Sequence, residues 1–109
     1  MDADAKREER ENIGSEFDRL TDEEIVVAVK DSEDQAAQNY LINKYRNFVR
    51  AKARSYFLIG ADREDIIQEG MIGLYKAIRD FRNDKLSSFR AFAELCVTRQ
   101  IITAIKTAT

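Results

Sequence analysis

The side chains of this 109-residue chain that could take part in acid–base or metal chemistry are almost all carboxylates. There is no histidine, which excludes histidine general bases, Ser–His triads and histidine-ligated metals. Cys96 is the only cysteine, so neither an intramolecular disulfide nor a thiolate zinc site can form. Asp65 and Glu69 stand four residues apart, a common helical spacing, and nothing in the sequence places two carboxylates in one pocket. The sequence therefore predicts that the protein is not an enzyme and uses no metal and no cofactor.

The same two carboxylates flank an apolar residue on a predicted helix over residues 62–81. This helix is amphipathic, and its predicted core face consists of Ile67, Met71, Leu74, Ile78 and Phe81. Ile72 lies on the opposite, polar face beside Asp65 and Glu69. A single exposed isoleucine is ordinary on a soluble protein. The alternative is a docking surface, in which an apolar anchor ringed by acceptors binds a basic partner.

A second candidate surface is basic. Arg46, Arg50 and Arg54 recur at four-residue spacing on the helix predicted for residues 33–57, and therefore share one face. Either this face is simply solvated, or it is a stripe that contacts nucleic-acid phosphates, where each contact adds salt-dependent affinity.

The third candidate surface lies on the last predicted helix, residues 89–107, which is apolar nearly all round. One ridge of this helix combines aromatic, guanidinium, amide and hydroxyl groups: Phe89, Phe92, Cys96, Arg99, Gln100 and Thr103. Such a ridge could stack on bases and hydrogen-bond to their edges. The alternative is that the phenylalanines belong to the core and the polar groups to its rim.

Composition limits the fold that positions these residues. The chain has 44% hydrophobic and 35% charged residues, four glycines and no proline, which favours long helices in a single domain. We therefore predict an all-α fold, a compact bundle of about four helices. The charged, apolar-poor residues 1–18 are predicted to be a flexible tail. The predicted helices are 21–30, 33–57, 62–81 and 89–107.

Capping residues mark the ends of these helices. The expected signals are a Thr21–Glu24 capping box, a second box at Ser32 and Gln35, a stop at Ile59–Ala61 around Gly60, an Asp62 cap, and a cap at Ser87 or Ser88. Gly70, Gly73 and Ala77, with Ile66, form a strip of small residues beside the predicted core face. Because glycine inside a helix costs about 1 kcal/mol relative to alanine, this strip predicts a helix packed close by.

Charge is distributed unevenly along the chain. Residues 1–31 carry five Lys/Arg against eleven Asp/Glu, whereas residues 32–109 carry thirteen against nine. The second part could meet nucleic acid, which the first part would repel. No apolar run reaches membrane-spanning length and the N-terminus has no signal-peptide pattern, so no membrane partner is expected.

Three segments together resemble region 2 of bacterial sigma factors: DIIQEGMIGLYKAIRDF at 65–81, SFRAFA at 88–93 and RQIIT at 99–103. The DxxQEGxxGL spacing in the first segment is highly specific. The segment 22–28, with the basic helix, resembles the portion just before it, region 1.2. The run KYRNFVRAKARSYF resembles the sporulation-type sigma-H group. The resemblance covers residues 19–109 and implies the N-terminal domain of a longer protein.

The resemblance also implies function. Sigma factors are cytoplasmic transcription initiation factors, and their region 2 binds core RNA polymerase and recognises and melts the promoter minus-ten element. The helix matching 62–81 docks on the coiled coil of the largest polymerase subunit; the matching residues are Asp65, Gln68, Glu69, Met71 and Ile72. The helix matching 88–107 captures flipped bases of the non-template strand. The expected DNA-binding residues are Phe89, Phe92, Arg99, Gln100 and Thr103, together with the stripe Arg46, Arg50 and Arg54.

Within this set, Gln100 and Thr103 match the pair that reads the upstream edge of the minus-ten element. The resemblance also admits an anti-sigma factor as a partner. Housekeeping sigma factors have two tryptophans before the Arg–Gln pair, where this chain has Leu95 and Cys96 nearby, which implies weaker promoter melting. Matching Phe89 to the family aromatic requires one extra residue before Arg99. Two other functions are compatible with the residues alone: a DNA-binding regulator acting without polymerase, and a helical protein-interaction module whose basic stripe is only solvated.

Overall fold

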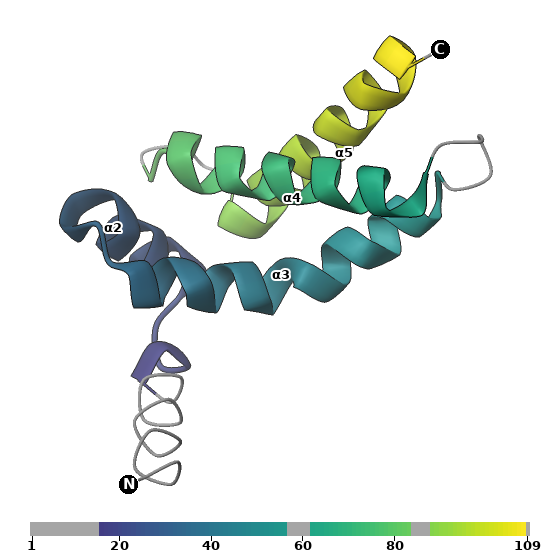
Figure 1. Ribbon diagram of the computed structural model, residues 1–109. Helices are drawn as coiled ribbons and strands as arrows, with labels where there is room; N and C mark the ends of the chain where they lie inside the picture. Colours follow the sequence, from purple (N-terminus) through teal and green to yellow (C-terminus); the bar gives the residue numbers. More distant parts are fainter. Residues whose placement is uncertain (1–15, 57–61, 84–87, 109) are drawn as a thin grey trace, which may run out of the picture.

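The computed structural model describes residues 16–56, 62–83 and 88–108, and these residues form helices with no strand among them (Figure 1). The all-α prediction is therefore confirmed. The helices are α2 (Asp22–Ser32), α3 (Gln35–Arg54), α4 (Arg63–Asp80) and α5 (Phe89–Ala108).

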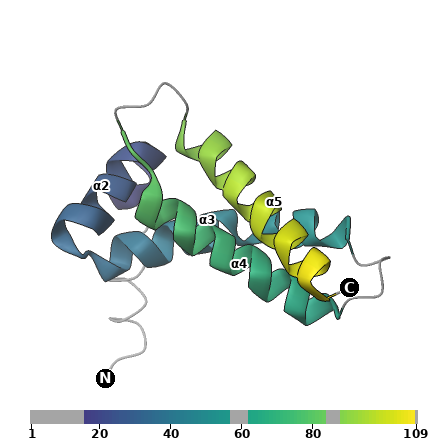
Figure 2. The same cartoon turned by 90° about the horizontal axis from the view of Figure 1, so that it is seen from above.

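Helix α4 is the centre of the arrangement, because the two most extensive helix contacts, with α5 and with α3, are both made by it. Its partner α5 runs antiparallel to it and crosses it at an angle, while α3 lies along its other side (Figures 1 and 2). Helix α2 covers the end of the bundle where α4 finishes and α5 begins. This arrangement brings the predicted docking helix and the predicted DNA-binding helix side by side.

The N-terminal caps predicted for α2, α4 and α5 are all present in the structure. Thr21 and Glu24 form the expected reciprocal capping box at the start of α2. The Asp62 carboxylate accepts hydrogen bonds from the backbone N–H groups of Glu64 and Asp65 at the start of α4. Ser88 Oγ accepts from the N–H of Ala91 at 3.1 Å, which leaves Ser88 as the observed cap of the last helix. The predicted stop around Gly60, and Ser87, lie outside the described residues.

The junction between α2 and α3 differs from the prediction. Helix α2 continues through Ser32, and Glu33 takes the left-handed conformation (φ 50°) that ends it. Asp34 therefore becomes the cap of α3, and its carboxylate accepts from the N–H of Ala37 at 3.1 Å. The predicted box at Ser32 is wrong because Ser32 is itself helical and its following residue makes the turn. Asp34 serves equally well, since aspartate and serine are both favoured caps.

The buried face of α4 is rotated from the predicted one toward the strip of small residues. Its buried residues are Ile66, Gly70, Gly73, Leu74, Ala77 and Ile78. Ile67 and Met71, which were predicted to be buried, are only partly buried against the core. The reason is the close approach of α5, as the glycines predicted. A β-carbon at Gly73 would lie only 2.8 Å from the backbone of Cys96 and Val97 on that helix.

Residues 16–18 do not behave as the flexible tail to which the prediction assigned them, and residues 1–15 lie outside the described part. Phe17 is buried, with its ring 5.5 Å from that of Tyr40. Asp18 accepts a hydrogen bond from the Tyr40 hydroxyl, which raises the pKa of Tyr40 to about 12. A single aromatic residue in a charged segment gives no periodicity, so the sequence contained no signal for this contact.

The tight packing at Gly73 leads to a stability prediction. We expect Gly73→Ala to lower the free energy of unfolding by about 1–3 kcal/mol, because the new methyl group meets backbone atoms that cannot rotate away. Gly70→Ala is the matched control. There the methyl group would meet side-chain atoms of Val49, Ile101 and Val97, which have more freedom to adjust than backbone. Urea unfolding followed by circular dichroism should therefore give a smaller loss for Gly70→Ala than for Gly73→Ala, and equal losses would contradict the close backbone contact.

Candidate functional site

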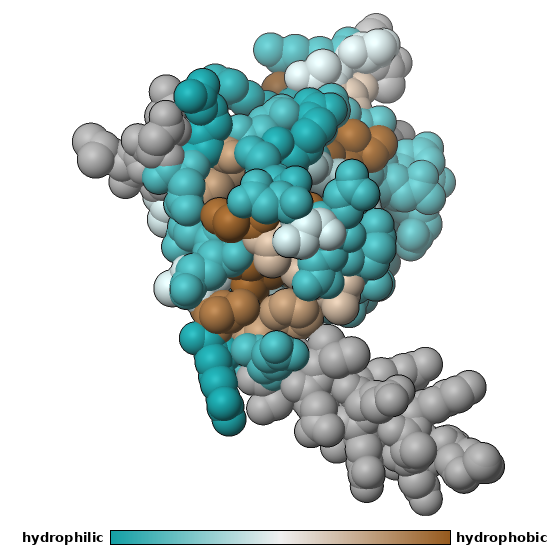
Figure 3. All heavy atoms as spheres, turned by 90° about the vertical axis from the view of Figure 1, so that its left-hand side faces the viewer, coloured by the Kyte–Doolittle hydropathy of each residue, from teal (hydrophilic) through white to brown (hydrophobic). Residues whose placement is uncertain are grey.

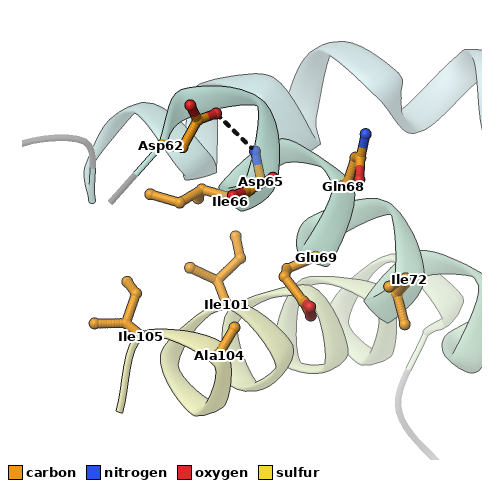
Figure 4. A pocket seen from close by; sticks show the side chains of 9 residues that line it. All are labelled: Asp62, Asp65, Ile66, Gln68, Glu69, Ile72, Ile101, Ala104 and Ile105. Atoms are coloured by element: carbon orange, nitrogen blue, oxygen red, sulfur yellow. Dashed lines mark hydrogen bonds between the residues drawn. The ribbon is translucent and has the colours of Figure 1, made fainter. Parts of the chain in front are cut away.

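A hollow of about 340 Å³ lies between α4 and the C-terminal half of α5 (Figure 4). Its apolar part consists of isoleucines from both helices, with Ile66 and Ile101 opposite each other. Its polar part comes from α4. The lining residues are Asp62, Asp65, Ile66, Gln68, Glu69, Ile72, Ile101, Ala104 and Ile105. The hollow thus combines an apolar surface with three carboxyl groups, and none of its lining residues is basic.

Four of the five predicted polymerase-binding residues lie around this hollow. Asp65, Gln68 and Ile72 are exposed and Glu69 is partly buried. The fifth, Met71, does not line the hollow, because it lies on the side of α4 that packs against the core. The carboxylates and the exposed isoleucine therefore lie together, as predicted, but Met71 is not part of this group.

Exposure alone does not distinguish Ile72. It is 42% exposed, and among the described residues four other large apolar side chains are exposed to a similar degree: Leu20, Val27, Tyr75 and Leu95. The face at the α2 end, for example, is mostly hydrophilic with apolar side chains showing in its crevices (Figure 3). What sets Ile72 apart is its place beside a hollow lined by acidic groups.

Sequence analysis missed the contribution of α5 to this site. Ile101, Ala104 and Ile105 line the hollow, although their helical spacing by itself is typical of a core-facing arc. Ile101 is fully buried, whereas Ala104 and Ile105 are partly exposed. The available signal was the width of the apolar surface on this helix, which exceeds what one core-facing side requires. Asp62 was predicted only as a cap, and it both caps α4 and lines the hollow.

The basic stripe on α3 is exposed along its length, as Arg46, Arg50 and Arg54 all face solvent. Arg50 and Arg54 line a second hollow, of about 470 Å³, at the point where the end of α3 meets the start of α4. Its other lining residues are Arg63, Glu64 and Ile67. Arg46 lies one helical turn away from this hollow. The stripe therefore forms a positive surface with one carboxylate at its edge.

Phe89 requires a correction, because the structure places it in the core and not on the predicted DNA-facing ridge. It is fully buried, and its ring makes edge-on contacts with Tyr45 and Phe81 at centroid distances of 5.6 and 5.5 Å. The Phe89 N–H donates to the Glu23 carboxylate at 2.8 Å, which ties the start of α5 to α2. The α-helical period places Phe89 in line with Ala93, Val97 and Ile101, all buried, so the core interpretation holds for this residue.

The other predicted DNA-binding residues on α5 remain accessible. Arg99 and Thr103 are exposed, and Phe92 and Gln100 are partly buried. The Phe92 ring packs against that of Phe81, with a centroid distance of 5.8 Å. The Gln100 amide makes two hydrogen bonds to α4, with Lys76 and with Glu69, at 2.8 Å each. Glu69 therefore contacts the predicted DNA-reading residue and also lines the acidic hollow.

The described residues show no cluster of three or more histidine, cysteine or acidic side chains suited to hold a metal ion. Cys96 is partly buried, which raises the pKa of its thiol. Among the same residues, no helix has the length and apolar character needed to cross a membrane.

Comparison with known proteins agrees with the resemblance found in the sequence. The family model for sigma-70 region 2 matches residues 41–109. The RNA polymerase sigma-H factor of Bacillus licheniformis is 76% identical over 93 residues, which are 85% of this chain and 41% of that protein. The sigma-H factor of Bacillus subtilis (strain 168) is 74% identical over 94 residues, 86% of this chain and 43% of that protein.

A more distant relative is the RNA polymerase sigma-B factor of Bacillus anthracis, 34% identical over 84 residues, 74% of this chain and 33% of that protein. The chain thus spans about two-fifths of the length of its sigma-H relatives. The similarity to the sigma-H group that the basic helix predicted is confirmed. Because the family model covers α4, α5 and most of α3, this chain belongs to the sigma-70 region 2 family.

Proposed function

We propose that this chain is the part of a transcription initiation factor that binds core RNA polymerase and the promoter minus-ten element. The observation that carries the proposal is the hollow between α4 and α5. A surface with isoleucines at its base and carboxyl groups at its edge suits an amphipathic basic helix, because burial of apolar groups and charge complementarity then act together.

The partner on this surface would be the coiled coil of the largest polymerase subunit. Arginine is well suited to the contact, since its guanidinium can form two parallel hydrogen bonds with a carboxylate while its methylene groups cover the isoleucines. Asp65 and Glu69 stand one turn apart on α4, so one helix of the coiled coil could meet both. Ile72 would provide the apolar anchor at the end of the hollow.

Capture of core RNA polymerase by this chain tests the proposal. The tagged chain is expected to retain purified core enzyme, and a fragment of the largest-subunit coiled coil added in excess should compete for it. Retention that is insensitive to the coiled-coil fragment would place the contact elsewhere, and absence of retention would contradict the proposed function.

The DNA contact would use the accessible part of α5. Phe92, Arg99, Gln100 and Thr103 offer one aromatic ring and three polar groups, which suit stacking and hydrogen bonding to exposed bases of the non-template strand. The chain itself would perform no catalysis, since polymerisation belongs to its partner, and it would act in the cytoplasm. The rival function, a DNA regulator acting without polymerase, is less well supported because such a protein has no use for an acidic hollow beside its DNA-binding helix.

The stripe on α3 is proposed to contact DNA phosphates. We expect Arg50→Ala to weaken promoter binding by the complex with core enzyme two- to fivefold or so, nearly equally for all sequences, and to flatten the salt dependence by roughly one counterion. Titrations at several salt concentrations measure both quantities. A loss confined to particular sequences would show that Arg50 contacts bases, and an unchanged salt slope would show that the stripe is only solvated.

A further inference from the structure

The side-chain amide of Gln100 is held from two sides by residues of α4. Lys76 Nζ donates to Gln100 Oε1 at 2.8 Å, and Gln100 Nε2 donates to Glu69 Oε2 at 2.8 Å. Lys76 and Glu69 are seven residues apart, which is two helical turns, so they present their side chains on the same side of α4. The amide of Gln100 thus bridges an ammonium group and a carboxylate across the α4–α5 interface.

The charges of these two partners permit only one orientation of the amide. If the amide were reversed, its NH₂ group would meet the Lys76 ammonium, and both groups are donors only. Its carbonyl would at the same time meet the Glu69 carboxylate, where both groups are acceptors. Hydrogen bonds to charged groups are roughly twice as strong as those between neutral groups. The identities of the two residues therefore fix which end of the Gln100 amide is the donor.

An amide with a fixed orientation can discriminate between base edges. After these two bonds the amide retains one N–H donor and one acceptor lone pair. A glutamine reads adenine by using both of these on its N7 and N6 positions, and the two are not interchangeable. A freely rotating amide would satisfy opposite donor and acceptor patterns equally well and would discriminate less.

We propose that Lys76 is a positioning residue for base recognition, acting through Gln100 rather than on DNA directly. This inference rests on the proposed promoter-binding function and adds to it a residue outside the predicted DNA-binding set. Lys76 is the suitable one of the two partners to test, since Glu69 also lines the acidic hollow and Lys76 does not. Lys76 is exposed, so its substitution leaves the core intact.

The test uses complexes of this chain with core RNA polymerase and short fork-junction DNAs in which one base pair of the minus-ten element is varied at a time. Gln100→Ala identifies the position read by the amide, and Thr103→Ala identifies that read by its neighbour. We expect Lys76→Met to reduce discrimination at the Gln100 position by about three- to tenfold, a part of what one bidentate base contact provides. Lys76→Arg, which keeps a cationic donor, should retain most of it.

Two further variants separate positioning from a general loss of charge. Lys52→Met removes one positive charge from α3, a helix that makes neither of the two bonds to Gln100, and should leave the base preference unchanged. In the double variant Lys76→Met with Gln100→Ala, base preference should equal that of Gln100→Ala alone, because Lys76 then has nothing to position.

The outcomes are distinguishable. Unaltered preference in Lys76→Met, a further change in the double variant, or an equal effect of Lys52→Met would each overturn the positioning role while the proposed function stands. A wild-type complex that shows no base preference at any position, or a chain that does not bind core enzyme, would instead overturn the proposed function and this inference with it.

Discussion

Glu69→Lys is expected to weaken binding of the largest-subunit coiled-coil fragment by about 2–5 kcal/mol, or roughly thirtyfold to several thousandfold. Two effects add at this position. The substitution removes a carboxylate from the hollow, and it places an ammonium group against the basic partner that the hollow is proposed to bind. Glu69 is partly buried between α4 and α5, so the introduced charge cannot move far away. Titration of the labelled fragment measures the loss directly.

Control variants separate the effect of the charge on binding from any effect of the substitution on folding. Glu69→Gln keeps the side-chain length and a hydrogen-bond acceptor, and it should give an intermediate loss. Glu94→Lys makes the same reversal at an exposed site of α5 outside the hollow, and it should bind nearly as wild type. All three variants should keep the far-ultraviolet helical signal. If a folded Glu69→Lys protein bound the fragment as tightly as the wild type, the hollow would not be the binding site of the coiled coil.

The helices were largely predictable because their signals are local. Thr21 with Glu24, and Asp62 before an amphipathic segment, predict helix starts from a few adjacent residues, and the structure has both caps. Gly70 and Gly73 predicted a close helix, since no residue with a side chain could occupy such a contact without displacement. The prediction that Ser32 caps α3 was wrong. Ser32 and Asp34 are both good capping residues, and the choice between them depends on how far the preceding helix continues.

The candidate site was less predictable, because it is formed by two helices meeting. The carboxylates of α4 and Ile72 could be found from one helical face. Ile101, Ala104 and Ile105 could not be assigned to the hollow, since their spacing fits a core arc equally well and only the crossing of α4 and α5 opens part of it to solvent. The contact of Gln100 with Lys76 and Glu69 joins residues 24 and 31 positions apart, beyond any local pattern.

The two aromatic residues of α5 illustrate the same limit. Phe89 and Phe92 are separated by one helical turn, and both fit a ridge that also carries Arg99 and Gln100. The structure separates them: Phe89 is enclosed by Tyr45 and Phe81, while Phe92 remains partly exposed. Sequence periodicity could not choose between core and ridge for these residues, because α5 is apolar on nearly every side and its hydrophobic face is poorly defined.

Phe89→Ala should therefore act on folding rather than on DNA. We expect it to lower the free energy of unfolding by about 3–5 kcal/mol, because it removes a fully buried ring and leaves a cavity between α3, α4 and α5. Phe89→Leu, which fills much of that space, should cost clearly less. Phe92→Ala is the matched comparison on the same helix, and its partly exposed ring should contribute less to stability. Urea unfolding of the three variants measures these differences. Promoter opening by the same variants separates folding from DNA binding. If Phe89→Ala had wild-type stability and yet impaired promoter opening, Phe89 would have to leave the core to meet DNA. If only Phe92→Ala impaired opening, the recognition surface on α5 would begin at Phe92.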